Sequence, residues 1–246
     1  MSAYQDLASA YDGLTMDVDY KGILDYLEAI LRRLDKKPKS VLDLGCGTGS
    51  MSVLLADAGY RVIGADISEE MLTVASQKSM DCENPPFFIR QAMQRLRLPM
   101  QVNAVFSLLD CLNYVTKPGD VRETIQRVYH NLTDGGVFIF DINTPYKLRN
   151  LDGQVFLDEN EESYCVWRAE FDPKENICYY GIDLFQKQGM LWRRSFEQHS
   201  EYAYEPSELM QWLKEAGFSN VLQFADRKFC DPSEDEQRIY FVAIKE

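Results

Sequence analysis

The chain has 246 residues, of which 46% are hydrophobic and 26% are charged, and its formal net charge is −13. This length and balance predict one globular domain, or one domain that carries a smaller insertion. An acidic surface repels phosphate backbones, so the charge argues against a nucleic-acid partner.

Cysteine and histidine usage argues against a zinc site. The six cysteines form no Cys-x-x-Cys pair, and His130 and His199 are the two histidines. Isolated cysteines are typical of a reducing cytosol. The first twelve residues lack the basic and apolar regions of a secretion signal, and no apolar run approaches the ~18–20 residues of a membrane helix. We therefore expect a cytoplasmic protein with no membrane segment and no bound metal.

The N-terminal part of the chain predicts two helices. Residues 2–14 have weak helical spacing, with Tyr11 on the apolar face. Two interpretations stay open for this segment: a helix packed on the domain, or a lid over a bound cofactor with Tyr11 close to it. A clearer amphipathic helix is predicted for Tyr20–Leu34, and Pro38 stops it.

From Ser40 onwards, strand-like and helix-like segments alternate. The expected strands are Ser40–Leu44, Arg61–Ile67, Phe87–Arg90, Asn103–Leu109 and Val137–Ile142; the expected helices are Met51–Ala58, Glu69 to about Ser79 with Ser68 as cap, and Asp120 to about Leu132 with Asp120 as cap. Such alternation predicts an α/β fold with right-handed crossovers and a parallel sheet that has helices on both faces.

The pattern changes after Asn143. From about Val155 to Tyr204 the helical period fades and aromatic and β-branched residues recur, which predicts an inserted antiparallel sheet. A helix capped by Ser207 and two strands, Val221–Ala225 and Arg238–Ile244, follow. We expect a main domain of residues 1–146 and 205–246 and an inserted β-region of residues 147–204.

The stretch Val41–Gly49 carries the most specific signal. Its glycines are spaced Gly-x-Gly-x-Gly, whereas a dinucleotide fingerprint reads Gly-x-Gly-x-x-Gly. Glycines there let the backbone approach a ligand, and the amides of the following helix face it. Asp43 can receive an ammonium group, directly or through water. Asp66, at the end of the next strand, can accept hydrogen bonds from both ribose hydroxyls.

Together, Val41–Gly49 and Asp66 resemble motifs I and II of the class I methyltransferases that depend on S-adenosylmethionine (SAM). The resemblance covers nearly the whole chain and is strongest to small bacterial methyltransferases of unassigned substrate. It implies a Rossmann-like, seven-stranded, mostly parallel sheet of order 3-2-1-4-5-7-6, with strand 7 antiparallel. Similar proteins also have an N-terminal Tyr-Asp pair, here Tyr11-Asp12, and an inserted β-region.

The same resemblance assigns the cofactor site. It implies that the following residues bind SAM: Tyr11, Asp43, Gly45, Cys46, Gly47, Gly49, Asp66, Ile67, Met71, Gln91, Ala92, Met93 and Leu109. Many relatives have an aspartate at the position of Ala92 to bind the adenine amino group. We expect Gln91, or backbone groups of Ala92 and Met93, to replace it.

Ligands of parallel α/β sheets bind at the carboxyl ends of the strands, so we expect the methyl acceptor beside Asp110–Tyr114. The polar candidates for catalysis are Asp110, Tyr114 and His199, with Asn113 beside them. Asp110 is equally explained by a turn, and His199 by an ordinary strand position. The run Asn143–Tyr146 is similar to an Asn-Pro-Pro-Tyr motif, but it follows strand five and lacks the first proline, so we interpret it as a turn.

The predicted function is SAM-dependent methyl transfer to a small molecule, with an amine as one candidate acceptor, by a monomer or homodimer. Two alternatives stay open: a SAM-binding sensor or scaffold without transferase activity, and a nicotinamide-dependent oxidoreductase, which the glycine spacing disfavours.

Overall fold

A seven-stranded sheet forms the centre of the protein in a computed structural model that describes residues 12 and 18–246. The strands, in spatial order, are β10 (Asn220–Ala225), β11 (Arg238–Ile244), β5 (Leu132–Asn143), β4 (Val102–Ser107), β1 (Ser40–Leu44), β2 (Arg61–Asp66) and β3 (Phe87–Arg90). β11 runs antiparallel to β5, and the strands from β5 to β3 are parallel. This confirms the predicted order, including the antiparallel seventh strand.

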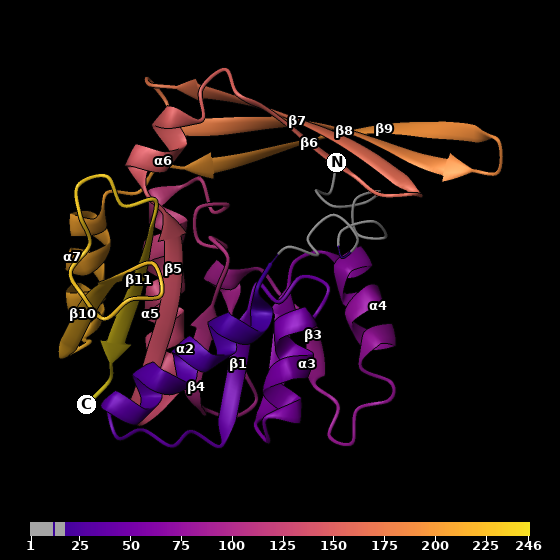
Figure 1. Ribbon diagram of the computed structural model, residues 1–246. Coiled ribbons are helices and arrows are strands. Elements are labelled where there is room, and N and C mark those ends of the chain that lie inside the picture. The colour runs from indigo at the N-terminus through magenta and orange to yellow at the C-terminus, as the bar shows by residue number, and fades with distance from the viewer. Residues whose placement is uncertain (1–11, 13–17) are drawn as a thin grey trace.

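Helices cover both faces of the sheet (Figure 1). They are α2 (Tyr20–Arg33), α3 (Ser50–Asp57), α4 (Glu69–Lys78), α5 (Pro118–Asn131) and α7 (Pro206–Ala216). A short helix, α6 (Pro145–Asn150), follows β5 and lies next to the antiparallel sheet, and a 3₁₀ helix spans Met93–Arg95. Among the described residues, none of these helices combines the length and the apolar character that crossing a membrane requires.

Alternation along β5 builds a hydrophobic core on each face. Phe138 and Phe140 pack with α5 and α7, whereas Val137 and Ile139 point to the other face and pack with α2 and α3. All four side chains are essentially fully buried. A strand buried on both faces reads as a continuous apolar run, which is why this segment could be identified from the sequence.

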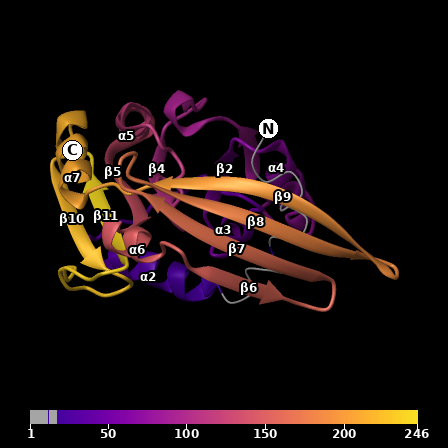
Figure 2. The same cartoon turned by 90° about the horizontal axis from the view of Figure 1, so that it is seen from above.

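The second sheet is antiparallel and contains β6 (Val155–Glu159), β7 (Ser163–Asp172), β8 (Ile177–Gln188) and β9 (Leu191–Tyr202) in sequential order. It lies across the end of the main sheet at which the parallel strands finish, and it extends over α3 and α4 (Figures 1 and 2). An antiparallel sheet was predicted for this region. The division into a main domain and an inserted region remains a prediction.

Two helices begin earlier than predicted. α5 begins at Pro118, with Lys117 rather than Asp120 as the capping residue, and α7 begins at Pro206, with Glu205 rather than Ser207. Proline fits the first turn of a helix because its missing N–H would have no partner there. Ser68 does cap α4, since its hydroxyl accepts a hydrogen bond from the Met71 amide at 3.2 Å.

β4 ends at Ser107, two residues earlier than predicted, because the chain turns at Leu109 and Asp110. Both residues have left-handed backbone conformations, with φ of 58° and 56°. Such conformations are unfavourable for side-chain-bearing residues. Here the buried carboxylate of Asp141 accepts hydrogen bonds from both backbone amides, at 2.7 and 3.0 Å, and holds the turn. Strand propensity alone could not reveal this distant partner.

Candidate active site

The glycine loop connects β1 to α3, and each of its glycines has a positive φ. At Gly45 a Cβ atom would lie 2.7 Å from both Cys111 Sγ and Met93 Cε, so packing excludes a side chain there. At Gly47 a Cβ would meet nothing within 4 Å, which leaves the backbone open to a ligand. Gly49 caps α3 and packs against Ala75.

Asp43 lies at the end of β1 and is only 3% exposed. Its carboxylate accepts a hydrogen bond of 2.5 Å from the hydroxyl of Ser52. Burial raises the pKa of Asp43 to about 6, and the charge of Asp66 adds to the effect. A neutral hydroxyl does not balance a buried negative charge, so this position favours a cationic group from a ligand.

Asp66 joins the loop to the end of β2. One carboxylate oxygen accepts from the Gly47 amide and the other from the Ser68 amide, each at 2.9 Å. Burial raises the pKa of Asp66, although these backbone bonds oppose the shift. Each carboxylate oxygen has a further lone pair, so this side chain can still accept hydrogen bonds from a diol.

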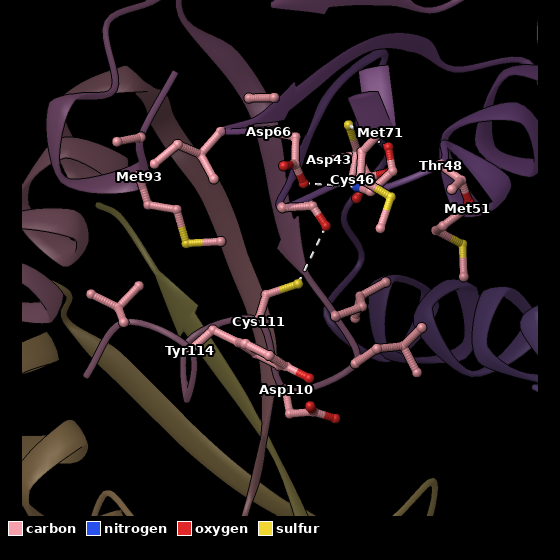
Figure 3. Close-up of a pocket in the computed structure, with 18 of the residues that line it drawn as sticks. Asp43, Cys46, Thr48, Met51, Asp66, Met71, Met93, Asp110, Cys111 and Tyr114 are labelled. Atoms are coloured by element: carbon pink, nitrogen blue, oxygen red, sulfur yellow. Dashed lines mark hydrogen bonds between the residues drawn. The ribbon is translucent and has the colours of Figure 1, made fainter. Parts of the chain in front are cut away.

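A cavity of about 520 Å³ opens in front of these groups, within the range of small-molecule sites. Figure 3 shows Asp43, Cys46 and Asp66 together, Met93 on one side, Thr48 and Met51 on the other, and Tyr114 and Asp110 below. The sequence-predicted residues that line the cavity are Asp43, Gly45, Cys46, Gly47, Asp66, Ile67, Met71, Gln91, Ala92, Met93, Leu109, Asp110 and Tyr114. The main sheet and its loops therefore bring nearly the whole predicted set together.

Gln91 lines the cavity, but its amide is held by another loop. Its oxygen accepts from the Arg97 backbone amide at 2.8 Å, and its nitrogen donates to the Arg97 carbonyl at 3.1 Å. Of the two predicted replacements for the missing aspartate, the backbone groups of Ala92 and Met93 are therefore better placed than the Gln91 side chain.

Asp12 forms an ion pair with Lys78 on α4 and a hydrogen bond with the glycine loop. Lys78 Nζ lies 2.7 Å from an Asp12 carboxylate oxygen, and the hydroxyl of Thr48 donates to Asp12 at 2.6 Å. Lys78 also donates to the Ser50 hydroxyl at 2.7 Å. Sequence reasoning grouped Asp12 with Tyr11 but did not identify Lys78, which lies 66 positions further along the chain.

The turn after β4 is held by a partly buried cation. Arg238, the first residue of β11, pairs with Asp141 and with Asp110, the latter at 2.6 Å. It also donates to the amide oxygen of Asn143 at 3.0 Å. Because β11 is antiparallel, its first residue lies at the edge where the parallel strands end; this rule could have identified Arg238 from the sequence.

A second cavity, of about 590 Å³, adjoins the first. It lies between the main sheet, α6 and the antiparallel sheet, and its lining residues are Asp110, Tyr114, Asn143, Tyr146, Lys147, Asn150, Leu151, Gln154, Phe156, Trp167, Tyr180, Glu201 and Gln237. Asp110 and Tyr114 line both cavities. Two separate ligands can therefore meet at these two side chains.

Comparisons with known proteins decide the family. The chain is 32% identical to YqeM of Bacillus subtilis, a protein assigned by name to the methyltransferases, over 98% of this chain and 97% of YqeM. The methyltransferase domain family matches residues 41–136. An S-adenosylmethionine-dependent methyltransferase from Clostridium acetobutylicum is 28% identical and superposes with a TM-score of 0.88 over 98% of both chains. The chain belongs to the SAM-dependent methyltransferases.

The sugar N-methyltransferase KedS8 from Streptoalloteichus has the same fold, with a TM-score of 0.80, 19% identity and coverage of 100% of this methyltransferase and 96% of KedS8. The family uses SAM, and the structure fits it on two features: the buried carboxyl of Asp43, and the open space before Gly47. Neither a nicotinamide-dependent oxidoreductase nor a SAM sensor without activity gains support.

Two predicted site residues of the methyltransferase, Gly49 and His199, line neither cavity. Gly49 is the cap of α3 and does not line the cavity, and Tyr11 lies outside the described residues. His199 is 4% exposed and lines neither of the two cavities. The imidazole ring of His199 packs edge-on against the ring of Tyr114, with the ring centroids 6.1 Å apart. Its Nε2 atom lies 2.9 Å from a carboxylate oxygen of Glu197.

The acid that sequence reasoning missed is Glu201, two residues after His199 on β9. Side chains at positions i and i+2 of a strand share one face, so both point away from solvent, but only Glu201 reaches the second cavity. Alternation could have placed Glu201 on this face. It could not show which of the two residues meets the cavity.

Proposed function

We propose that this methyltransferase transfers a methyl group to an amine nitrogen of a small molecule that binds in the second cavity. The observation that carries the proposal is the pair of adjoining cavities, which share Asp110 and Tyr114. One cavity has the glycine loop and its two acids, and the other has a mixed aromatic and acidic wall. In-line transfer needs the donor and the acceptor to meet at such a junction.

In this proposal the first cavity holds SAM. Asp43 accepts from the ammonium of the methionine part, and Asp66 accepts from the ribose hydroxyls, with its orientation fixed by the Gly47 and Ser68 amides. Ile67 and Met71 contact the adenine ring, and the backbone at Ala92 and Met93 faces its edge. Bound SAM supplies a methyl group on a sulfonium, which is already a strong electrophile.

An amine is the favoured acceptor because two acidic side chains, Glu201 and Asp110, line the second cavity, where Lys147 is held by a hydrogen bond to Asn143. Carboxylates attract ammonium groups and repel anionic substrates. The shared fold of a sugar N-methyltransferase gives additional support to nitrogen as the acceptor atom. The net charge of −13 points in the same direction and disfavours nucleic acid.

The protein's own groups position the acceptor. Tyr114 lies at the junction, and Arg238 holds Asp110 in place through its ion pair of 2.6 Å. A carboxylate paired in this way orients a substrate better than it removes a proton. The antiparallel sheet covers the second cavity with Trp167 and Tyr180, so in this proposal it is a substrate cap that excludes water.

An acceptor screen tests the proposal. The purified protein is incubated with SAM and matched amines, alcohols and carboxylic acids, and with DNA and RNA, and release of S-adenosylhomocysteine (SAH) is measured. We expect turnover with at least one small amine. Turnover confined to hydroxyl acceptors or to nucleic acid would contradict the proposal.

Calorimetry tests the donor site. Asp66→Ala is expected to weaken SAM binding by about 1–3 kcal/mol, because the ribose hydroxyls and two backbone amides lose their acceptor. An unchanged affinity would show that the ribose assignment is incorrect.

A further inference from the structure

Glu201 is a buried acid on β9, and no cationic side chain of that strand pairs with it. It lies near the end of β9, is 3% exposed, and forms part of the wall of the second cavity. Burying a carboxylate is costly unless its charge is balanced. A protein that keeps such a group at a cavity wall either uses it or depends on it for folding, and its contacts distinguish these two roles.

Glu201 accepts a hydrogen bond from a neutral amide. Asn143 Nδ2 donates to Glu201 at 2.8 Å. The oxygen of the same amide accepts from Lys147 at 2.8 Å and from Arg238 at 3.0 Å, which fixes the orientation of the amide. The two cations therefore face the far side of Asn143, and the near side offers Glu201 a hydrogen bond without a balancing charge.

Charged and titratable groups from every neighbouring element act on Glu201. Burial raises the pKa of Glu201 to about 8, and the negative charge of Asp110 on the turn after β4 adds to the effect; Asn143, Lys147 on α6 and a hydrogen bond from Tyr180 on β8 oppose it. Cys178, its register partner on β8, stays neutral because burial raises the pKa of that thiol to about 11. Burial likewise raises the pKa of Tyr180.

We propose that Glu201 is the proton acceptor for the acceptor amine, and that this amine is primary or secondary and enters the second cavity as an ammonium ion. The inference rests on the proposed function. It goes further, because it names the group that makes an ammonium reactive, and it assigns that task to Glu201 rather than to Asp110, which is already paired with Arg238.

The reaction begins with proton transfer and ends with methyl transfer. An ammonium has no lone pair, so one N–H proton moves first to the Glu201 carboxylate and gives a neutral amine and a carboxylic acid. The freed lone pair forms the N–C bond to the methyl group, and the C–S bond breaks with its electron pair going to sulfur. The products are a methylated ammonium and a neutral thioether, and Glu201 later returns its proton to water.

The test uses three amines, each beside its hydroxyl counterpart: glucosamine and glucose, ethanolamine and ethylene glycol, benzylamine and benzyl alcohol. Binding to the SAH-loaded full-length protein is measured by ligand-observed NMR, and turnover by SAH release. Glu201→Gln keeps the shape and the hydrogen bond to Asn143 but cannot take a proton. Glu205→Gln is the matched control, since Glu205 pairs with Arg149 at the surface, at 3.0 Å.

We expect the wild-type protein to bind at least one amine ten times more tightly than its hydroxyl counterpart. This affinity rises about fivefold from pH 7 to pH 8, as Glu201 ionises. Glu201→Gln removes both the preference and the pH dependence and lowers kcat for that amine about 100-fold. The control variant Glu205→Gln keeps the amine preference, the pH dependence and kcat of the wild-type protein. Because the affinity for SAH stays within twofold in both variants, the loss cannot be attributed to misfolding.

Two results would overturn the inference: no amine preference in the wild-type protein, or a preference and pH dependence that persist in Glu201→Gln. Failure of the wild-type protein to bind SAH is a different result. It would remove the proposed function itself, and the inference with it.

Discussion

Replacing Asp43 by Asn tests what the negative charge just before the glycine loop contributes. The carboxylate is 3% exposed, and it accepts a hydrogen bond of 2.5 Å from the neutral hydroxyl of Ser52. Asparagine has the same shape and can still accept from that hydroxyl. Asp43→Asn therefore removes a buried charge and leaves the packing almost unchanged.

The change should stabilise the protein when no SAM is bound. The pKa of Asp43 is raised to about 6, whereas an exposed aspartate titrates near ~3.9. The folded state thus binds more protons than the unfolded state between these pH values, so stability falls as the pH rises from about 4 to 6. At about 1.4 kcal/mol per pKa unit, the full difference is at most about 3 kcal/mol above pH 6. We expect Asp43→Asn to gain about 1–3 kcal/mol at pH 7.5, measured by urea unfolding.

The same change should weaken SAM binding. If Asp43 receives the ammonium of SAM, its removal leaves a desolvated cation without a partner, at a cost of about 3 kcal/mol or more, which is at least a hundredfold in Kd. For the wild-type protein, protonation of Asp43 should raise Kd about tenfold between pH 7 and pH 5. Calorimetry over this range measures both effects, and Asp43→Asn should lose the part of the pH dependence that comes from Asp43.

Asp57→Asn serves as the control, because Asp57 is an exposed acid at the end of α3. It should change neither stability nor affinity by more than about 0.5 kcal/mol. A wild-type affinity that is flat from pH 5 to pH 7, or an Asp43→Asn variant that binds SAM normally, would refute the reasoning. A variant that loses both stability and affinity would show that the carboxylate is a structural group.

Two further predictions concern the framework of the site. Arg238→Met leaves the carboxylates of Asp110 and Asp141 buried without their cation, so it should destabilise the fold by about 3–5 kcal/mol at pH 7.5. The loss should be smaller at pH 5, because burial already raises the pKa of Asp141 and lower pH neutralises it; urea unfolding at both pH values, with Arg122→Met at a surface ion pair as control, checks this. Gly49→Ala would place a Cβ 2.8 Å from that of Ala75 at φ +76°, and should cost about 2–4 kcal/mol. Gly59→Ala has φ +93° but open space, so it should cost only about 1–2 kcal/mol in the same assay; equal losses would contradict the packing argument.

The fold could be predicted because its signals are local. β5 is a continuous apolar run, and the glycine spacing of the loop after β1 is visible within nine residues. Each signal depends on near neighbours in the chain, as do the serine that caps α4 and the turns of the antiparallel sheet. The strand order came from a resemblance to a known family, which no local pattern could have supplied.

The catalytic region could be predicted only in part, because its geometry depends on distant partners. The predicted strand runs to Leu109, but β4 ends at Ser107, because Asp141, more than thirty positions away, accepts hydrogen bonds from the amides of Leu109 and Asp110. Arg238 then pairs with Asp110 across 128 positions. Sequence reasoning placed Asp110 at the carboxyl ends of the strands, where it lines both cavities, but it could not show that the side chain is already engaged in an ion pair.

The pairing of Arg238 with Asp110 and Asp141 also explains why the two cavities can differ in electrostatic character. Arg238 pairs with Asp110, which lines both cavities, and with the fully buried Asp141, and the Asn143 amide bonds to Arg238 through its oxygen and to Glu201 through its nitrogen. Burial and the negative charge of Asp110 raise the pKa of Glu201 to about 8, although Asn143 and the cation of Lys147 oppose this shift. The amide of Asn143 thus separates a wall that orients ligands from an acid that is able to exchange a proton.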